Sequence, residues 1–241
     1  EVGAADVDRW YAARAGRTPI HVGVSVGPIQ VRMAVMGDVP AFLPGAKSGA
    51  AVRPASPEQL AELQRGLERG LQRGALGVGF GMAYTPVATS AEILQMFRVA
   101  ATFGAPCFVH LRYGGTAEPG SALQGLTEVI ALALVTGAPL HVVHIQSTGA
   151  RGTQQLLELV AAARARGLDI TTECYPYTAG MSEIQAAIFE PESLARRGLS
   201  FSDLQWGATG ERLTAETFAK YRRQGGLVIL HSNTEEIVRA A

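Results

Sequence analysis

Between residues 56 and 174, stretches with the spacing of amphipathic helices alternate with short, almost uninterrupted apolar runs. Strands that are apolar on both faces are typical of parallel sheets, which helices cover on both sides. A regular alternation of helix and strand predicts repeated α/β units around such a sheet. The expected strands cover residues 20–26, 75–80, 107–110, 140–144 and 168–174, with 227–231 as a sixth candidate.

Capping sequences mark where the helices begin. Ser56 is followed by Pro57 at the first helical position and by Gln59 at the third, which is the pattern of a capping box. Thr89 and Glu92 repeat the same spacing. These signals predict helices that start after residues 56 and 89. Further helices are expected over residues 122–136, 153–166 and 214–223.

The number of strands limits the architecture. Five or six strands are too few for an eight-stranded α/β barrel. Either the sheet is open and doubly wound, or barrel strands are absent from the two ends of the chain. Residues 37–55 and 180–210 are irregular and follow the carboxyl ends of expected strands, where α/β proteins place functional loops.

Composition excludes some classes of partner. The chain has 241 residues, 47% of them apolar, which is enough for a sizeable core. Basic and acidic residues both number 21, so we expect no nucleic acid and no anionic membrane as a partner. No apolar run is long enough to span a membrane, and no signal-peptide pattern is visible. We expect a cytoplasmic protein. Cys107 and Cys174 lie in strand-like runs and are expected to be buried free thiols.

Two histidines occupy the same position relative to their strands. His110 and His144 each end an apolar run, directly before a polar loop that contains glycine. In an α/β barrel this places both imidazoles at the catalytic rim, on neighbouring strands. Neutral imidazole nitrogens are common zinc ligands, so the pattern predicts a metal site. An ordinary hydrogen-bonded role for each histidine is the alternative.

The other polar residues near strand ends are assigned by position. His141 precedes His144 by three residues, so strand alternation is expected to turn it toward the helices, in a structural role. His21 opens its run at the opposite rim and is also expected to be structural. His231 and Glu173 end their runs and are further candidates for ligands, and Glu173 could also act as a base or pair with an arginine.

Five motifs occur in the order, and at about the spacing, of a known enzyme family. They are Gly74-Ala75-Leu76-Gly77-Val78-Gly79, Tyr84-Thr85-Pro86, Val109-His110-Leu111-Arg112, Val143-His144-Ile145 and Glu173-Cys174-Tyr175-Pro176-Tyr177-Thr178-Ala179-Gly180. From about residue 22 to residue 241, the chain resembles the N-acyl-D-amino-acid deacylases (D-aminoacylases) of the metal-dependent amidohydrolase superfamily.

The resemblance implies a (β/α)8 TIM-type barrel that is incomplete. Residues 1–241 would form a partial catalytic domain with about strands three to seven, lacking the first two and the last. His110 and His144 would bind the tighter of two metal positions, with one or two zinc ions in the complete enzyme. The family's H-x-H pair, its cysteine ligand and its catalytic aspartate in an S-D-G context do not occur at the matching places. We therefore expect the aspartate to lie outside this chain, and the chain alone to bind zinc weakly and to be inactive.

The resemblance also implies a small-molecule amide substrate and residues that contact it. Tyr177 and Arg112 would hydrogen-bond its polar ends, and Tyr84 is a further candidate. Gln146 stands where deacylases of simple D-amino acids place a lysine that binds the substrate carboxylate, and Gly114 stands where an acidic residue is usual. Loss of the cation predicts a weakened preference for a free carboxylate.

The predicted activity is hydrolysis of the amide bond in N-acyl-D-amino acids or a related amide, with a metal that polarises the scissile carbonyl. One alternative is another amidohydrolase, such as a cyclic-amide hydrolase, which shares the histidines but not the Tyr-Pro-Tyr-Thr-Ala-Gly element. The other is a truncated remnant or scaffold without catalysis, whose open strand edges would favour self-association. Nucleotide binding is not favoured, because no G-x-G-x-x-G motif follows the first expected strand.

Overall fold

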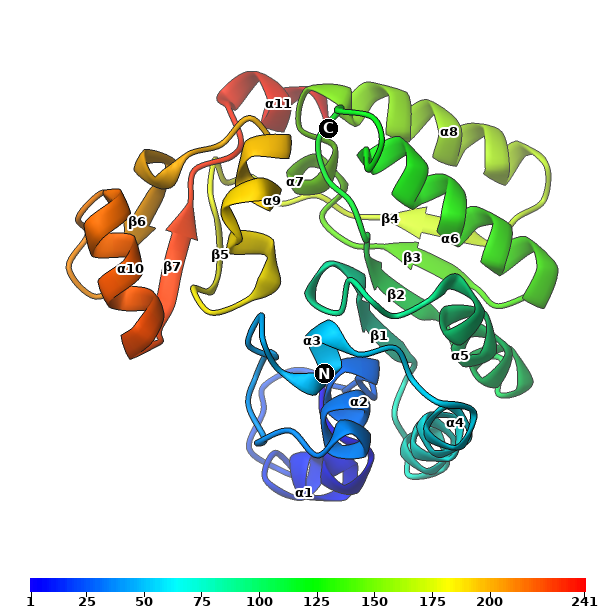
Figure 1. The fold of residues 1–241 in the computed structure, drawn as a ribbon. Helices are drawn as coiled ribbons and strands as arrows, with labels where there is room; N and C mark the ends of the chain where they lie inside the picture. Colours follow the sequence, from blue (N-terminus) through cyan, green and yellow to red (C-terminus); the bar gives the residue numbers. More distant parts are fainter.

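The computed structural model describes residues 1–241, apart from the side chain of Ala240. A parallel sheet of four strands forms its centre, in the order in which the strands follow along the chain (Figure 1). The strands are β1 (Val78–Gly81), β2 (Cys107–His110), β3 (Leu140–Val142) and β4 (Ile170–Thr172). The helices around them are α4 (Pro57–Gln72), α5 (Ser90–Thr102), α6 (Ala122–Thr136) and α8 (Thr153–Ala165). The predicted repeated α/β units are confirmed.

Local sequence explains the helix starts. At α4, the Ser56 side chain accepts a hydrogen bond from the Gln59 backbone N–H, and the Gln59 side chain accepts one from the Ser56 N–H. This is the predicted capping box. At α5, Thr89 caps the Glu92 N–H, but the Glu92 carboxylate turns inward to Arg32. The second capping box is therefore only half formed.

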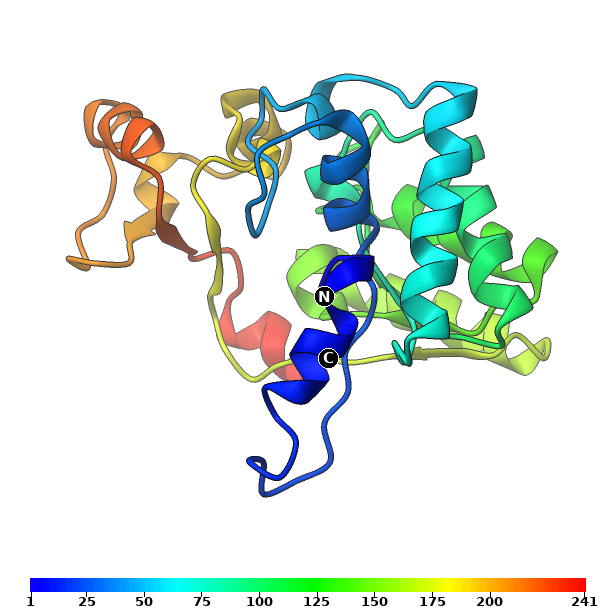
Figure 2. The ribbon, with the colours of Figure 1, turned by 90° about the horizontal axis from the view of Figure 1, so that it is seen from below.

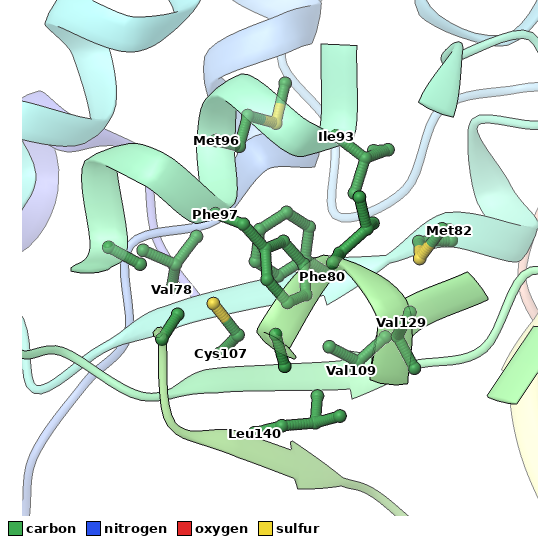
Figure 3. Packing of buried hydrophobic residues seen from close by; sticks show 14 of the residues in the cluster. Val78, Phe80, Met82, Ile93, Met96, Phe97, Cys107, Val109, Val129 and Leu140 are labelled. Atoms are coloured by element: carbon green, nitrogen blue, oxygen red, sulfur yellow. The ribbon is translucent and has the colours of Figure 1, made fainter. Parts of the chain in front are cut away.

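The four helices cover one face of the parallel sheet (Figure 1). Figure 3 shows the buried side chains between the two layers, where Cys107 and Val109 of β2 and Leu140 of β3 belong to the same cluster as Phe97 and Val129 of the helices. Residues at alternating strand positions face the other way, since successive side chains of a strand point to opposite faces. The polar site described below lies on that opposite face.

Of the run 20–26, only the last part pairs with the parallel sheet. Val26 makes a parallel bridge to Val78 of β1, and its N–H donates to the Gly77 carbonyl at 3.0 Å. Ile20 and Val22 are exposed, so the apolar run that predicted a buried strand is not covered. The expected strand over residues 20–26 is therefore wrong for most of its length.

The sixth candidate strand belongs to a second sheet. β7 (Leu227–Leu230) lies between β5 (Gly180–Glu183) and β6 (Leu204–Trp206), and both pairings are antiparallel. The expectation that residues 227–231 extend the parallel sheet is thus wrong. Helix α10 (Ala215–Gln224) packs on this sheet, and its Tyr221 ring stacks on Trp206 at 4.2 Å.

A second apolar core joins this antiparallel sheet to the N-terminal third of the chain. Ile29 and Met33 of α2 (Pro28–Met36) share it with Leu204 and Val228 of the sheet. The other α-helices are α1 (Val7–Ala12), α3 (Gly49–Val52), α7 (Ile145–Gly149), α9 (Pro191–Arg196) and α11 (Glu235–Ala240). Short 3₁₀ turns cover Ala4–Asp6, Met82–Tyr84, Ala150–Gly152, Ala187–Phe189 and Phe201–Asp203.

The two sheets lie on different sides of the molecule. Figures 1 and 2 both place the antiparallel sheet with α10 (orange) on the side away from the helices of the parallel sheet (cyan to green). Within the described residues the parallel strands do not close into a barrel. Across that same part of the chain, every helix is too short or too polar to cross a membrane.

Candidate active site

Two histidines meet at the carboxyl end of the parallel sheet. His110 is the last residue of β2, and His144 follows the neighbouring strand β3. Nδ1 of His110 lies 3.0 Å from Nε2 of His144, and the ring centroids are 4.7 Å apart. The predicted geometry is confirmed, because the strands are adjacent and the two nitrogens are close enough for a single ion with bonds of about 2.0 to 2.1 Å.

An unusual backbone conformation turns His144 toward His110. His144 has φ 37° and ψ 55°, in the left-handed region that few residues other than glycine adopt. The chain has already left β3 after Val142, so strand alternation no longer determines where this side chain points. The Thr148 hydroxyl of α7 lies 3.4 Å from Nδ1 of His144. Strained backbone of this kind concentrates at functional sites.

The expectation that His141 faces the helices is wrong. Its ring lies 5.6 Å from that of Phe108, on the face of the sheet opposite the helical layer. Nδ1 of His141 lies 2.7 Å from the Thr171 hydroxyl, and Nε2 lies 3.5 Å from the Glu173 carboxylate. The prediction failed because it counted the alternation back from His144, which stands outside the regular strand.

Burial lowers the pKa of both histidines of the pair. For His110 the main cause is desolvation, and the neighbouring His144 and Arg197 add to it. For His144 desolvation is again the largest cause, and a backbone hydrogen bond and Glu173 oppose it. A lowered pKa favours the neutral imidazole near pH 7, which is the form that binds a metal ion.

The pair fits a zinc ion in donor type and spacing but supplies only two ligands. Across the described residues, no group of three or more histidine, cysteine, aspartate or glutamate side chains is placed to hold a metal. Catalytic zinc sites normally use three protein ligands. Of the further candidates, Glu173 lies beside His141, and Nε2 of His231 lies 2.8 Å from Oε1 of Gln205 in the second sheet.

A cavity of about 250 Å³ opens beside the histidine pair. Residues of both sheets line it, and Tyr84, Tyr175 and Arg197 reach it from the segments between the strands. The Tyr84 ring lies 5.1 Å from that of His110, and its hydroxyl accepts a hydrogen bond from Ser182 at 3.3 Å. A concave site with a few polar groups among apolar ones is typical of small-molecule binding.

Arg112 borders this cavity, but its guanidinium is already bonded. Its Nε and one terminal nitrogen donate to the two oxygens of Glu128 at 3.0 and 2.9 Å. The other terminal nitrogen donates to the Ala88 carbonyl at 2.8 Å. The structure therefore places Arg112 in a contact between the loop after β2, α6 and the loop before α5. That Arg112 hydrogen-bonds the substrate stays a prediction, since the residue borders the cavity while these contacts hold its guanidinium.

Gln146 and Tyr177 lie outside the cavity lining. Gln146 is fully buried, and its side-chain nitrogen donates to the Tyr175 carbonyl at 2.9 Å. Tyr177 is 68% exposed. Tyr175 lines the cavity instead of Tyr177. Residues 174–179 follow β4 without regular strand structure, so sequence alternation could not show which tyrosine points inward.

Arg197 is a cavity residue that the sequence motifs do not mark. It follows α9 directly, within the irregular segment 180–210. No periodic pattern or motif singles it out from the neighbouring Arg196. Only the general expectation that loops after strands carry function pointed to this segment.

Comparison with solved structures identifies the fold. The chain is similar to a Bordetella bronchiseptica N-acyl-D-glutamate deacylase complexed with zinc and a phosphonate inhibitor, with a TM-score of 0.74 and 24% identity over 98% of this chain and 49% of that one. It is also similar to a D-aminoacylase structure described in terms of its binuclear metal centre, with a TM-score of 0.74 and 22% identity over 97% of this chain and 48% of that one. The chain has the fold of the D-aminoacylases. The resemblance expected from the motifs is confirmed for the fold, and the chain spans about half the length of these structures.

No family model matches the chain, and none of the curated proteins matches it. Similarity to the D-aminoacylase fold therefore comes from the three-dimensional arrangement, at 21–24% sequence identity. At this level of identity the comparison shows how the chain folds. The function of the site depends on its own residues.

Proposed function

We propose that this chain is part of a metal-dependent amidohydrolase and that His110 and His144 are two of its metal ligands. The observation that carries the proposal is the pair of nitrogens 3.0 Å apart at the carboxyl ends of adjacent parallel strands. In α/β barrels this end of the sheet holds the active site. The similarity in fold to a deacylase complexed with zinc supports the choice of metal.

The proposal places the remaining barrel strands, a third metal ligand and the catalytic aspartate in a part of the protein outside residues 1–241. Two observations support it. The described residues provide two ligands where catalytic zinc normally has three. The solved structures of the same fold are about twice as long as this chain.

The chemistry divides between the ion and the cavity. A bound zinc ion supplies Lewis-acid activation of an amide carbonyl and of water. The cavity residues orient the substrate, with the Tyr84 hydroxyl and the Arg197 guanidinium among the polar groups beside the histidine pair. The substrate that we propose is an N-acyl-D-amino acid or a closely related amide, in keeping with the fold.

The experiment measures amine release from N-acetyl-D-amino acids, their L enantiomers and a cyclic amide. It uses the zinc-loaded protein together with any sequence that its gene places on either side of residues 1–241. We expect hydrolysis of the D enantiomers and its loss in His110→Ala. His141→Ala is the matched control, since it removes a histidine of the neighbouring strand outside the pair and should retain activity.

Two outcomes would contradict the proposal. A folded, zinc-loaded protein that releases amine from none of the N-acetyl substrates would exclude the deacylase activity. Cleavage of the cyclic amide alone would assign the site to the other branch of amidohydrolases.

A further inference from the structure

Arg197 brings a positive charge to the cavity. Its side chain lines the cavity together with Tyr84, Tyr175 and the two histidines. It is close enough to His110 and His144 to lower the pKa of both, and close enough to the two phenols for their interaction to oppose the desolvation that lowers its own pKa. A guanidinium keeps its charge under these conditions.

This cation has no anionic partner in the described part of the chain. The arginine ion pairs found there use Arg9, Arg32, Arg65, Arg69, Arg73, Arg112, Arg222 and Arg239. The groups that act on the Arg197 pKa from nearby are phenols, not carboxylates. A charge that is partly removed from water without a partner is costly, so a site of this kind favours an anionic ligand.

The loop after β2 leaves the space beside this guanidinium open. A Cβ atom on Gly114 would lie 3.5 Å from Nε of Arg197 and 3.4 Å from the Thr148 carbonyl oxygen. These are ordinary contact distances, so a side chain at position 114 would touch the guanidinium without a clash. With glycine there, position 114 places no side chain against this side of the cation.

The other polar groups suggested for anion binding are occupied or remote. Arg112 is paired with Glu128, and Gln146 is buried outside the cavity. Arg196 borders the cavity but is exposed to solvent, where a charge contributes little to binding. Tyr84 accepts its hydrogen bond from Ser182, so its own hydroxyl hydrogen is free to donate to a ligand.

We propose that Arg197 determines specificity by binding a carboxylate of the substrate, and this rests on the proposed function. A guanidinium donates two parallel N–H groups to a carboxylate, and the Tyr84 hydroxyl can donate a third hydrogen bond to the same group. The carboxylate is then held beside the histidine pair, with the amide turned toward the metal position. Arg197, which directly follows α9, thereby supplies a cation that is absent at position 146, where the chain has Gln146.

Ligand binding to the metal-free protein tests this assignment. The probes are N-acetyl-D-amino acids with small, apolar and acidic side chains, each measured beside its own carboxamide by calorimetry or NMR titration. We expect the free carboxylate to bind about 10-fold to 100-fold more tightly than the carboxamide, as for hydrogen bonds to charged groups. Equal binding of acid and amide by the wild-type protein, or binding of neither, overturns the proposal.

Two matched pairs of variants assign the effect to the cation. Arg197→Gln should abolish the preference for the acid, whereas Arg196→Gln removes the same charge one residue away and should retain it. Gly114→Asp places a carboxylate against the guanidinium and should also abolish the preference, whereas the isosteric Gly114→Asn should keep most of it. Equal preference in Arg197→Gln and wild type, or the same loss in both Gly114 variants, contradicts the proposal.

The readout separates this inference from the proposed function. Carboxylate preference is measured without metal and without turnover, so it does not depend on the third ligand or the aspartate. A preference that depends on Arg197 in a protein that never hydrolyses N-acyl substrates would refute the hydrolase and leave an anion site. Hydrolysis without the preference would refute the role of Arg197 alone.

Discussion

Arg32 is almost completely buried, and its guanidinium contacts the Glu92 carboxylate at the start of α5. Its Nε also donates to the Ala50 carbonyl at 2.9 Å. These contacts tie α2 to α3 and α5 through one side chain. Because the Glu92 carboxylate is buried as well, removal of Arg32 would leave a charge without a partner away from water.

We predict that Arg32→Met lowers the free energy of unfolding by about 3 to 5 kcal/mol, as expected for a buried pair that loses one partner. The control is Arg65→Met, which breaks the exposed pair with Glu62 and should cost about 1 kcal/mol or less. Urea unfolding followed by circular dichroism measures both. Similar losses in the two variants would mean that burial does not increase the contribution of the Arg32 pair to the free energy of unfolding.

At the scale of residues, sequence predicted positions better than orientations. His110 and His144 could be found because the ends of apolar strands predict which edge of a sheet they share. Arg112, Gln146 and Tyr177 could not be oriented, because each follows a strand end where local backbone angles decide where the side chain points. The left-handed angles of His144 are the clearest example, since they override the alternation of β3.

Helix α4 packs closely on its neighbour α2 because it carries glycine at the contact. A Cβ atom on Gly66 would lie 2.4 Å from one methyl carbon of Val31 in α2, which is too close. The same atom would lie 3.6 Å from the Val31 Cβ, at a normal distance. The conflict therefore comes from this one valine methyl group.

We predict that Gly66→Ala destabilises the protein by about 1 to 3 kcal/mol, because overpacking outweighs the gain of about 1 kcal/mol in helix propensity. In a Val31→Ala background the same change should cost less or become stabilising, since the clashing methyl group is gone. Thermal unfolding of the two single variants and the double variant gives the coupling energy. Additive effects would show that the helices separate readily at this point.

At the scale of elements, local signals were sufficient for helices but not for all strands. Capping residues predicted the starts of α4 and α5, and β2 has the predicted bounds. Residues 20–26 and 227–231 have the same apolar character as the strands of the parallel sheet. Whether each run forms a strand, and in which sheet, depends on distant partners. These partners are Val78 for residues 20–26, and the antiparallel strands β5 and β6 for residues 227–231.

The two cysteines report on the folding of the whole molecule. Cys107 is buried in the core between sheet and helices, and burial raises the pKa of its thiol (Figure 3). Cys174 is exposed, contrary to the expectation that both thiols are buried. The apolar run predicted a strand to residue 174, but β4 ends at Thr172.

We predict that a thiol reagent at pH 8 modifies Cys174 rapidly and Cys107 only when the core opens, since the thiolate is the reactive form. Cys174→Ser should remove the fast phase and leave a slow one, which accelerates in urea. Mass spectrometry of the modified protein over time measures both phases. Two fast phases in the native protein would contradict the packing of the parallel sheet.

The central claim for the whole molecule is that His110 and His144 form a metal position, and zinc titration followed by NMR of the histidine rings tests it most directly. With two ligands from this chain, we predict weak binding in which the ring signals of His110 and His144 shift together. His21, His141 and His231 should respond only at higher zinc, and His110→Ala should remove the response of His144. Zinc binding first at His141 or His231, with the His110 and His144 rings unchanged, would contradict the account.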